Sequence, residues 1–196
     1  MYYHGLSKRL GGKAVEFRLG AFSDLPALKA VYAKIVESMD EAGICIWDDV
    51  YPCEFFAEDI EKKSLYLLTD GGDMLGSFTL SDANDGADAV VWKYTCGKAM
   101  YIEKLGVNVA FRGRGIGAKL IGHAEQVCLA MGANALRLFV AQVNAPAIKL
   151  YEKSGFVRAS GTYAEVIGPA FTLIEYGYEK PLGNANGSRK QDRRIR

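Results

Sequence analysis

The sequence predicts a single domain of the α/β class. Segments whose apolar residues recur with the 3.6-residue period of a helix alternate with short apolar segments typical of strands. The alternation is clearest in residues 101–156, which are expected to form a strand, a glycine-rich turn, a helix, a strand and a helix. The chain has 196 residues with 49% hydrophobic content, which is enough for one sizeable core.

The first part of the chain is expected to supply two helices and three strands. Ser23 or Asp24 can cap the first helix, and Gly43 can end it. Asp70-Gly-Gly-Asp73 is typical of a tight hairpin turn. We expect strands at 14–18, 64–69 and 74–81, helices at 25–41 and 53–63, and then an irregular stretch at 82–99.

The second part is expected to add four strands and two helices. Gly155 can end the last helix, and Ile167-Gly-Pro169 is a turn between the final two strands. We expect strands at 101–107, 136–140, 157–165 and 171–179, and helices at 116–131 and 145–153.

The segment Arg112-Gly-Arg-Gly-Ile-Gly117 is a candidate anion-binding turn. Its three glycines carry no Cβ atoms, so their N–H groups can close on a bulky anion. The helix that follows adds unpaired N–H groups and the positive end of its dipole. With Arg112 and Arg114 beside it, the turn favours a pyrophosphate, and tight packing is the alternative explanation for the glycines.

Two better-known phosphate motifs do not fit this segment. A P-loop requires Gly-Lys followed by Ser or Thr, and the chain has Ala118-Lys-Leu120 instead. A dinucleotide fingerprint requires a third glycine at the position of Leu120 and an acid after the next strand, where Ala141 and Gln142 stand.

Residues 101–156 resemble the core of the GNAT superfamily of acyl-CoA-dependent N-acetyltransferases. Arg112–Gly117 matches that family's diphosphate signature, Gln/Arg-x-x-Gly-x-Gly/Ala. Leu105-Gly-Val107 is similar to its pantetheine-binding strand, and Asn144 with Leu150-Tyr-Glu-Lys-Ser-Gly-Phe156 is similar to its second signature. The chain has Ala110 where many members carry proline. More loosely, the resemblance extends over about residues 14–180.

The resemblance implies one GNAT-like domain at 14–182. Its central sheet is expected to be mixed and mostly antiparallel, with about seven strands flanked by about four helices. The fourth and fifth strands are expected to splay apart to admit acyl-CoA. The leader at 1–13 and the basic tail at 183–196 are expected to be flexible.

The resemblance also implies acetyl-CoA as acyl donor. The diphosphate is expected at the amides of 113–118, and pantetheine along the strand that contains Leu105. Asn144 has two interpretations, a bond to pantetheine or a cap for the helix at 145. The cofactor-binding residues are expected to be Leu105, Gly106, Val107, Arg112, Gly113, Arg114, Gly115, Ile116, Gly117, Ala118, Asn144 and Tyr151.

Two residues are candidates for proton transfer. The resemblance places Tyr151 where it can protonate the departing thiolate as general acid; the alternative is a tyrosine packed in the core. Strand alternation sets Tyr101, Glu103 and Leu105 on one face. Relatives often place a base on this face, and Glu103 is the candidate; the alternatives are a water chain and a surface glutamate paired with a lysine.

The amine pocket is expected to be lined by aromatic residues. Trp47, Tyr51, Trp92 and Tyr101 are the candidates, and ordinary core packing is the alternative for each. Asp48 and Asp49 can attract a cationic amine or simply form a solvated turn. In the family that the chain resembles, the segment between the first strand and the second helix forms much of this wall.

Composition argues against other partners. The net charge of +1 gives no broad attraction to nucleic acid or membrane, and no apolar run reaches the ~20 residues of a membrane span. No signal peptide is visible, so we expect a cytoplasmic location. The four cysteines and two histidines show no metal-ligand spacing. The family's frequent dimers make a homodimer one expectation.

The sequence therefore predicts an N-acetyltransferase that moves an acetyl group to a primary amine of a small molecule or amino-acid-like substrate. No cysteine lies in the motifs to carry the acyl group, which favours direct transfer in a ternary complex. Two alternatives remain, a sensor that binds acyl-CoA without chemistry and an acetyltransferase for peptides or proteins.

Overall fold

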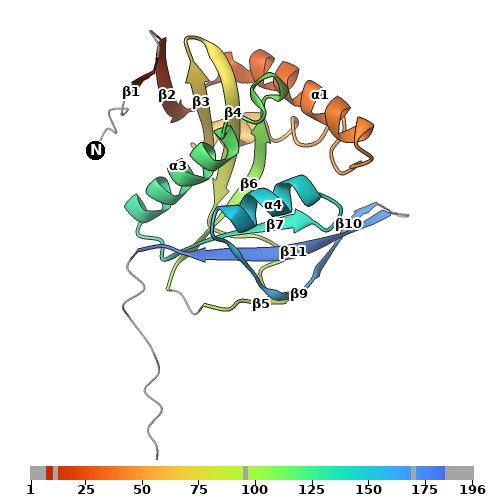
Figure 1. Cartoon of the computed structure of the whole chain (residues 1–196). Coiled ribbons are helices and arrows are strands. Elements are labelled where there is room, and N and C mark those ends of the chain that lie inside the picture. The colour runs from red at the N-terminus through yellow and green to blue at the C-terminus, as the bar shows by residue number, and fades with distance from the viewer. Residues whose placement is uncertain (1–7, 11–12, 95–96, 169–170, 184–196) are drawn as a thin grey trace, which may run out of the picture.

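The computed structural model describes residues 8–10, 13–94, 97–168 and 171–183 (Figure 1). Residues 1–7 and 11–12 of the expected leader and 184–196 of the basic tail lie outside this part. The strands are β1 (Lys8–Leu10), β2 (Lys13–Leu19), β3 (Leu65–Asp70), β4 (Asp73–Ser81), β5 (Val90–Val91), β6 (Ala99–Val107), β7 (Ala135–Ala141), β8 (Val157–Arg158), β9 (Ser160–Gly161), β10 (Tyr163–Gly168) and β11 (Phe171–Pro181).

The main sheet has the strand order β1-β2-β3-β4-β6-β7-β11-β10, and β8 pairs with β11. All pairs in it are antiparallel except β6 with β7. The helices are α1 (Leu25–Glu41), α2 (Phe56–Glu61), α3 (Ile116–Ala130) and α4 (Ala145–Lys153), with single 3₁₀ turns at Phe22–Asp24 and Val109–Phe111. The predicted mixed, mostly antiparallel sheet with flanking helices is confirmed.

Two hydrophobic clusters hold the layers together. On one face of the sheet, α1 and α2 bury side chains such as Leu28, Tyr32 and Phe56, each fully buried, against β3 and β4. On the other face, α3 and α4 cover β4, β6 and β7, with Leu120 and Leu136 fully buried. Each helix packs through one apolar stripe, as the 3.6-residue period requires.

The sheet opens between β6 and β7. Their pairing covers only Ala99–Tyr101 against Ala135–Arg137, and beyond it the two strands diverge (Figure 1). At the point of divergence, β6 carries a bulge: the register with β4 shifts between Ser77 and Thr79, and Lys104 has a φ of 51°. The expected splaying is therefore confirmed.

The bulge overturns one expectation about β6. We predicted that Leu105 shares a face with Tyr101 and Glu103, as simple alternation requires. Leu105 instead packs against the cluster under α3, because the extra residue at the bulge shifts the alternation by one position. Gly106 then faces α1, where an added Cβ would lie 2.6 Å from the Tyr32 ring.

Other differences from the predicted elements are local. The expected strand at 157–165 is divided among β8, β9 and the start of β10, and the irregular stretch at 82–99 contains β5, which pairs with β9. We did not predict β1. Asp24 stands at the N-cap of α1, but its carboxylate accepts hydrogen bonds from Arg18 and the Ala21 N–H rather than from the helix.

Gly106→Ala is expected to destabilise the protein by about 1–3 kcal/mol, because the added methyl group would overlap the buried Tyr32 ring. Gly122→Ala is the matched control. Gly122 lies inside α3 with nothing within 4 Å of an added Cβ, so alanine is expected to stabilise the helix by up to about 1 kcal/mol. Chemical denaturation measures both, and equal effects would contradict the close packing at Gly106.

Candidate active site

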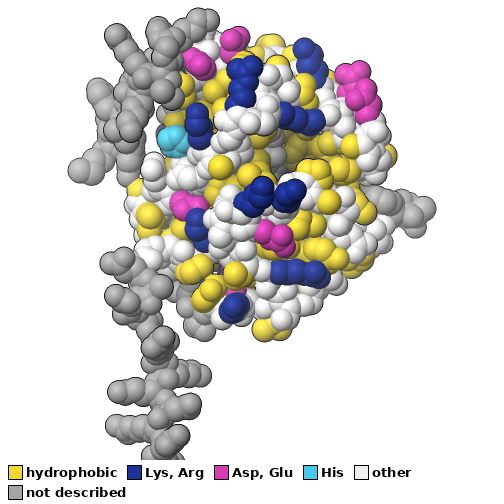
Figure 2. Space-filling view, viewed as in Figure 1, with side chains coloured by type: hydrophobic (Ala, Val, Ile, Leu, Met, Phe, Trp, Pro, Cys, Tyr) yellow, Lys and Arg dark blue, Asp and Glu magenta, His cyan; other side chains and the backbone are white. Residues whose placement is uncertain are grey.

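A cavity of about 940 Å³ opens where β6 and β7 diverge. Figure 2 shows a hollow on this face with hydrophobic side chains gathered in it and Lys and Arg side chains beside it. Of the residues predicted from the sequence, it is lined by Trp47, Tyr51, Glu103, Leu105, Val107, Arg112, Gly113, Gly115, Ile116, Gly117, Ala118, Asn144 and Tyr151.

The three glycines of the turn do different things. Gly113 and Gly115 have φ values of 76° and 72°, which disfavour other residues, and nothing lies within 4 Å of an added Cβ on either. Gly117 instead permits close packing, because an added Cβ would lie 2.7 Å from Leu150 Cδ2. Gly117 therefore fits the tight-packing interpretation, whereas Gly113 and Gly115 leave the open space that the anion-binding interpretation requires.

The start of α3 presents free N–H groups to the cavity. The bond from the Lys119 N–H to the Gly115 carbonyl is the first i→i−4 bond, so the preceding N–H groups have no partner within the helix. Arg112 lies at the same rim and donates a hydrogen bond to Ser38 Oγ. Arg114 does not line the cavity and lies over the Phe111 ring, 5.2 Å from its centroid. This end of the cavity suits an anion.

The open edge of β6 supplies a second set of backbone donors. The Asn108 N–H donates to the Leu75 carbonyl on the β4 side. Because successive N–H groups of a strand point in opposite directions, that of Val107 points toward the gap that β7 leaves. Leu105 and Val107 line the cavity, whereas Gly106 faces α1.

The start of α4 closes the cavity. Asn144 Oδ1 accepts a hydrogen bond of 3.2 Å from the Ala147 N–H, so this residue caps the helix while it also lines the cavity. Tyr151 lies about two turns further along α4. It is only 8% exposed and packs edge-to-face with Phe156. Its hydroxyl has no hydrogen-bond partner within the described residues. Burial raises the pKa of Tyr151, so the phenol stays protonated.

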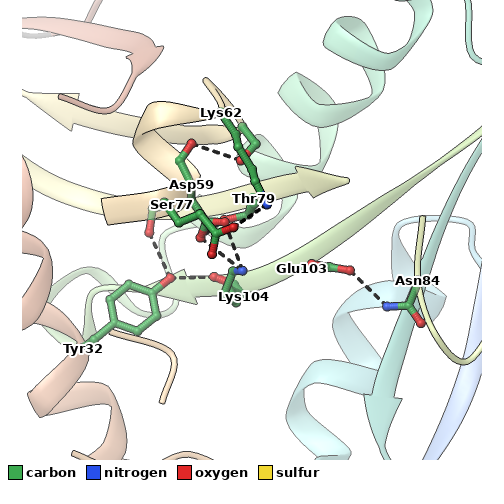
Figure 3. A network of polar contacts seen from close by, with 10 residues as sticks. Tyr32, Asp59, Lys62, Ser77, Thr79, Asn84, Glu103 and Lys104 are labelled. Carbon is green, nitrogen blue, oxygen red and sulfur yellow. Dashed lines mark hydrogen bonds and ion pairs between the residues drawn. The ribbon is translucent and has the colours of Figure 1, made fainter. Parts of the chain in front are cut away.

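Glu103 lies on the face of β6 opposite to that of Leu105. Its Oε1 accepts a hydrogen bond of 3.0 Å from Asn84 Nδ2 (Figure 3). Burial raises the pKa of Glu103, and the bond from Asn84 partly offsets this effect. A carboxylate with a raised pKa at the wall of a cavity is a candidate general base.

The side chain of the neighbouring Lys104 is directed toward Asp59 of α2 rather than toward the Glu103 carboxylate. Its Nζ lies 3.1 Å from Asp59 Oδ2, and Thr79 Oγ1 donates to the same oxygen at 3.2 Å (Figure 3). The interpretation of Glu103 as half of a surface ion pair with a lysine is therefore not what the structure shows.

Sequence analysis missed two further carboxylates in the cavity, Glu165 on β10 and Glu175 on β11. Burial, followed by the charges of Glu165 and Glu103, raises the pKa of Glu175 to about 7. Burial, followed by the charges of Asp85 and Glu103, raises the pKa of Glu165. The only sequence signal was their spacing in the final hairpin, and the face they share depends on its register.

The aromatic candidates divide into two groups. Trp47 and Tyr51 line the cavity, together with Phe55 from the same segment. Trp92 and Tyr101 lie outside it and pack against each other, with ring centroids 6.3 Å apart.

Trp92 is held in place by its own contacts. Its Nε1 donates to the Ala87 carbonyl at 2.9 Å, and the Arg137 guanidinium lies 4.3 Å from its centroid. Asp48 and Asp49 also lie outside the cavity. Asp48 Oδ1 accepts hydrogen bonds from the Val50 and Tyr51 N–H groups, which is a turn-forming role.

Comparison with known proteins identifies the class of protein that this fold and cavity define. The chain belongs to the acetyltransferase (GNAT) family, whose family model matches residues 32–156. YwnH of Bacillus subtilis (strain 168), provisionally named a phosphinothricin acetyltransferase, is 27% identical over 143 residues, which cover 71% of this chain and 82% of YwnH.

Two other relatives add detail. The streptothricin acetyltransferase of Streptomyces lavendulae is 32% identical over 99 residues, or 50% of this chain and 47% of that protein. The acetyltransferase yncA from Salmonella typhimurium, solved with acetyl-CoA, has a TM-score of 0.60 at 16% identity and covers 88% of this chain and 96% of its own. This likeness shows the fold.

The described residues contain neither a membrane-spanning helix nor a metal-ligand cluster. None of their helices is long and apolar enough to cross a membrane. They also contain no group of three or more His, Cys, Asp or Glu side chains placed to hold a metal ion.

Glu175→Gln is expected to make the protein more stable than the parent at pH 8 but not at pH 4. The pKa of Glu175 is raised to about 7 in the folded protein, whereas an unfolded glutamate titrates near ~4.3. The folded state therefore holds a proton that the unfolded state has lost, and the parent loses stability as pH rises between these values.

Calorimetry across this pH range measures the difference. Glu16→Gln, which removes a charge from an exposed position on β2, is the matched control. A difference between parent and E175Q that stays constant from pH 4 to pH 8 would contradict the raised pKa.

Proposed function

We propose that this protein is an acetyl-CoA-dependent N-acetyltransferase that acetylates a primary amine of a small molecule or amino-acid-like substrate by direct transfer. Membership of the GNAT family supports the acetyl transfer, and the yncA structure shows that a protein of this fold holds acetyl-CoA. The names of YwnH and the streptothricin acetyltransferase support a small-molecule acceptor.

The observation that carries the proposal is the arrangement of one cavity. The free N–H groups at the start of α3, the open edge of β6 and the Tyr151 hydroxyl, which has no partner among the described residues, all border it. An elongated ligand with a diphosphate, amide groups and a thioester needs these three features together. The open space above Gly113 and Gly115 fits the diphosphate, because any Cβ there would occupy it.

Acetyl-CoA supplies an activated thioester, and its reaction with an amine forms an amide and releases a thiol. The protein's own groups account for the charges that change. The Val107 N–H, which points into the gap, can donate to the thioester oxygen as negative charge develops there. Tyr151 can give its proton to the departing sulfur, because burial keeps its phenol protonated.

Glu103 accepts the proton that the amine must lose. Its raised pKa makes it a stronger base than an exposed glutamate, and it lies on the cavity wall with Asn84 to orient it. No cysteine of the described residues lines the cavity, which supports direct transfer over an acyl-enzyme.

Gly115→Ala is expected to weaken acetyl-CoA binding roughly tenfold, about 1.4 kcal/mol, because its methyl group would stand among the N–H groups that face the diphosphate. Gly132→Ala is the matched control. Gly132 follows the other end of α3 with a φ of 76° and equally open space, so it carries the same backbone strain of ~1–2 kcal/mol without touching the cavity. Calorimetric titration measures both, and equal affinities would remove the glycine turn as the diphosphate site.

Tyr151→Phe is expected to lower kcat by about a hundredfold while leaving acetyl-CoA affinity nearly unchanged, because only the proton donor is lost. The assay is thiol release from acetyl-CoA with a panel of amines. Tyr66→Phe is the matched control, since Tyr66 stacks on Phe17 and Phe78 outside the cavity. Undiminished kcat in Y151F would take Tyr151 out of the mechanism. Binding without thiol release from any amine would favour an acyl-CoA sensor.

A further inference from the structure

Three carboxylates from three different strands face the cavity together. Glu103 lies on β6, Glu175 on β11 and Glu165 on β10. The register explains the grouping: Tyr163 pairs with Glu175 across the hairpin, so Tyr163 and Glu165 share the face of Glu175. Asp85, from the loop after β4, lines the same region.

No positive side chain of the described residues neutralises this group. None of its members forms an ion pair. The nearby cations are already engaged: Lys104 with Asp59, and Arg137 with Glu179 at 3.5 Å and the Trp92 ring. Arg112 lies at the diphosphate end, bonded to Ser38.

The carboxylates repel one another. The charges of Glu103 and Glu165 add to burial in raising the pKa of Glu175, and those of Asp85 and Glu103 do the same for Glu165. Together with burial, the charges of Glu165, Glu103 and Glu175 also raise the pKa of Tyr51. Like charges held close together favour a bound cation that relieves the repulsion.

Two other features of the cavity point to a ligand at this place. Tyr151, more than nine-tenths buried, has a hydroxyl without a partner among the described residues. The aromatic side chains of Trp47, Tyr51 and Phe55 form one wall of the cavity. The faces of such rings can contact an ammonium group and its methylene chain.

We infer that the acceptor carries a second positive charge in addition to the amine that is acetylated, and that Glu165 and Glu175 bind this second charge while Glu103 faces the reacting amine. The inference rests on the proposed function and names the substrate class of the same site, an alkyl diamine or another small amine with a distal ammonium group. It also excludes acceptors whose far end is anionic, because an anion there would meet three carboxylates and, in the part of the chain that the structure describes, no unpaired cation.

Three amines with chains of equal length separate the possibilities. Cadaverine ends in a second ammonium group, pentylamine in a methyl group and δ-aminovalerate in a carboxylate. We expect kcat/KM to be about tenfold or more higher for cadaverine than for pentylamine, and lowest for δ-aminovalerate. Phosphinothricin, which carries a phosphinate and a carboxylate, is expected to be acetylated no better than δ-aminovalerate.

Variants then locate the second charge. Glu165→Gln and Glu175→Gln are each expected to lower kcat/KM for cadaverine by roughly five- to tenfold, mainly through KM, and to change that for pentylamine by less than about twofold. The matched control is Glu16→Gln, which removes one negative charge at an exposed position on β2 outside the cavity. This control is expected to leave kcat/KM unchanged for both cadaverine and pentylamine.

The outcomes separate this inference from the proposed function. Equal kcat/KM for cadaverine and pentylamine, or an equal loss for both in E165Q and E175Q, would overturn the inference and leave the acetyltransferase standing. Thiol release from no amine would count against the proposed function. Calorimetric titration of the CoA-bound protein with cadaverine and pentylamine then decides the inference by itself: tighter binding of cadaverine supports it, and equal or absent binding overturns it.

Discussion

A hydrogen bond of 2.6 Å from the Tyr32 hydroxyl to the Lys104 carbonyl holds the bulge on which the cavity depends. The same hydroxyl lies 2.9 Å from Ser77 Oγ on the neighbouring strand, so one buried side chain of α1 ties β4 and β6 together at the irregularity. Lys104 has a positive φ, which is unfavourable for a lysine. Its side chain is held at the other end by Asp59, so the bulge is fixed from both its backbone and its side chain.

The bulge has two consequences for the chemistry. It lies just beyond the end of the pairing of β6 with β7, where backbone donors of β6 face a gap instead of a neighbouring strand. It also changes which side chains share a face, so that Glu103 lies with the acidic group while Leu105 packs toward α3. One added residue in a strand therefore places a backbone donor and a carboxylate on the same cavity.

The two ends of the cavity have opposite electrostatic character. At the start of α3, backbone N–H groups and a helix dipole offer partial positive charge. At the hairpin of β10 and β11, carboxylates offer negative charge. Tyr151 lies on the cavity wall contributed by α4 and is neutral. The proposed function uses both ends, because the first attracts an anionic acyl donor and the second a cationic acceptor.

Local signals were enough to predict much of the fold and many of the residues that line the cavity. The helices at 25–41 and 145–153 match α1 and α4 residue for residue, because their ends are marked by Asp24, Gly43, Asn144 and Gly155, and the last three have the geometry expected of them. The glycine turn was recognisable because the spacing of its glycines is a local feature of the sequence. These are properties of a few neighbouring residues.

The positions of the other side chains in and around the cavity depend on contacts between distant parts of the chain. Nothing near Glu175 in the sequence shows that β11 will pair with β7 on one side and β10 on the other, yet this register brings it to Glu103 and Glu165. Trp92 was expected in the pocket because it is aromatic, but Arg137 and the Ala87 carbonyl, from other segments, hold it elsewhere. Side chains placed by sheet register are invisible to local patterns.

The negative charges of Glu165 and Glu175 are not neutralised by the described residues that pack around them. Carboxylates with raised pKa values destabilise the folded state at neutral pH, because the unfolded chain ionises them more easily. Three other buried or half-buried acids of this chain have a cationic partner: Asp59 has Lys104, Glu125 has Lys180 and Asp24 has Arg18. Glu165 and Glu175 lie in the same protein without such a partner in its described part. A group of like charges that weakens the fold, at the wall of a cavity, is explained by a ligand of the opposite charge that completes it.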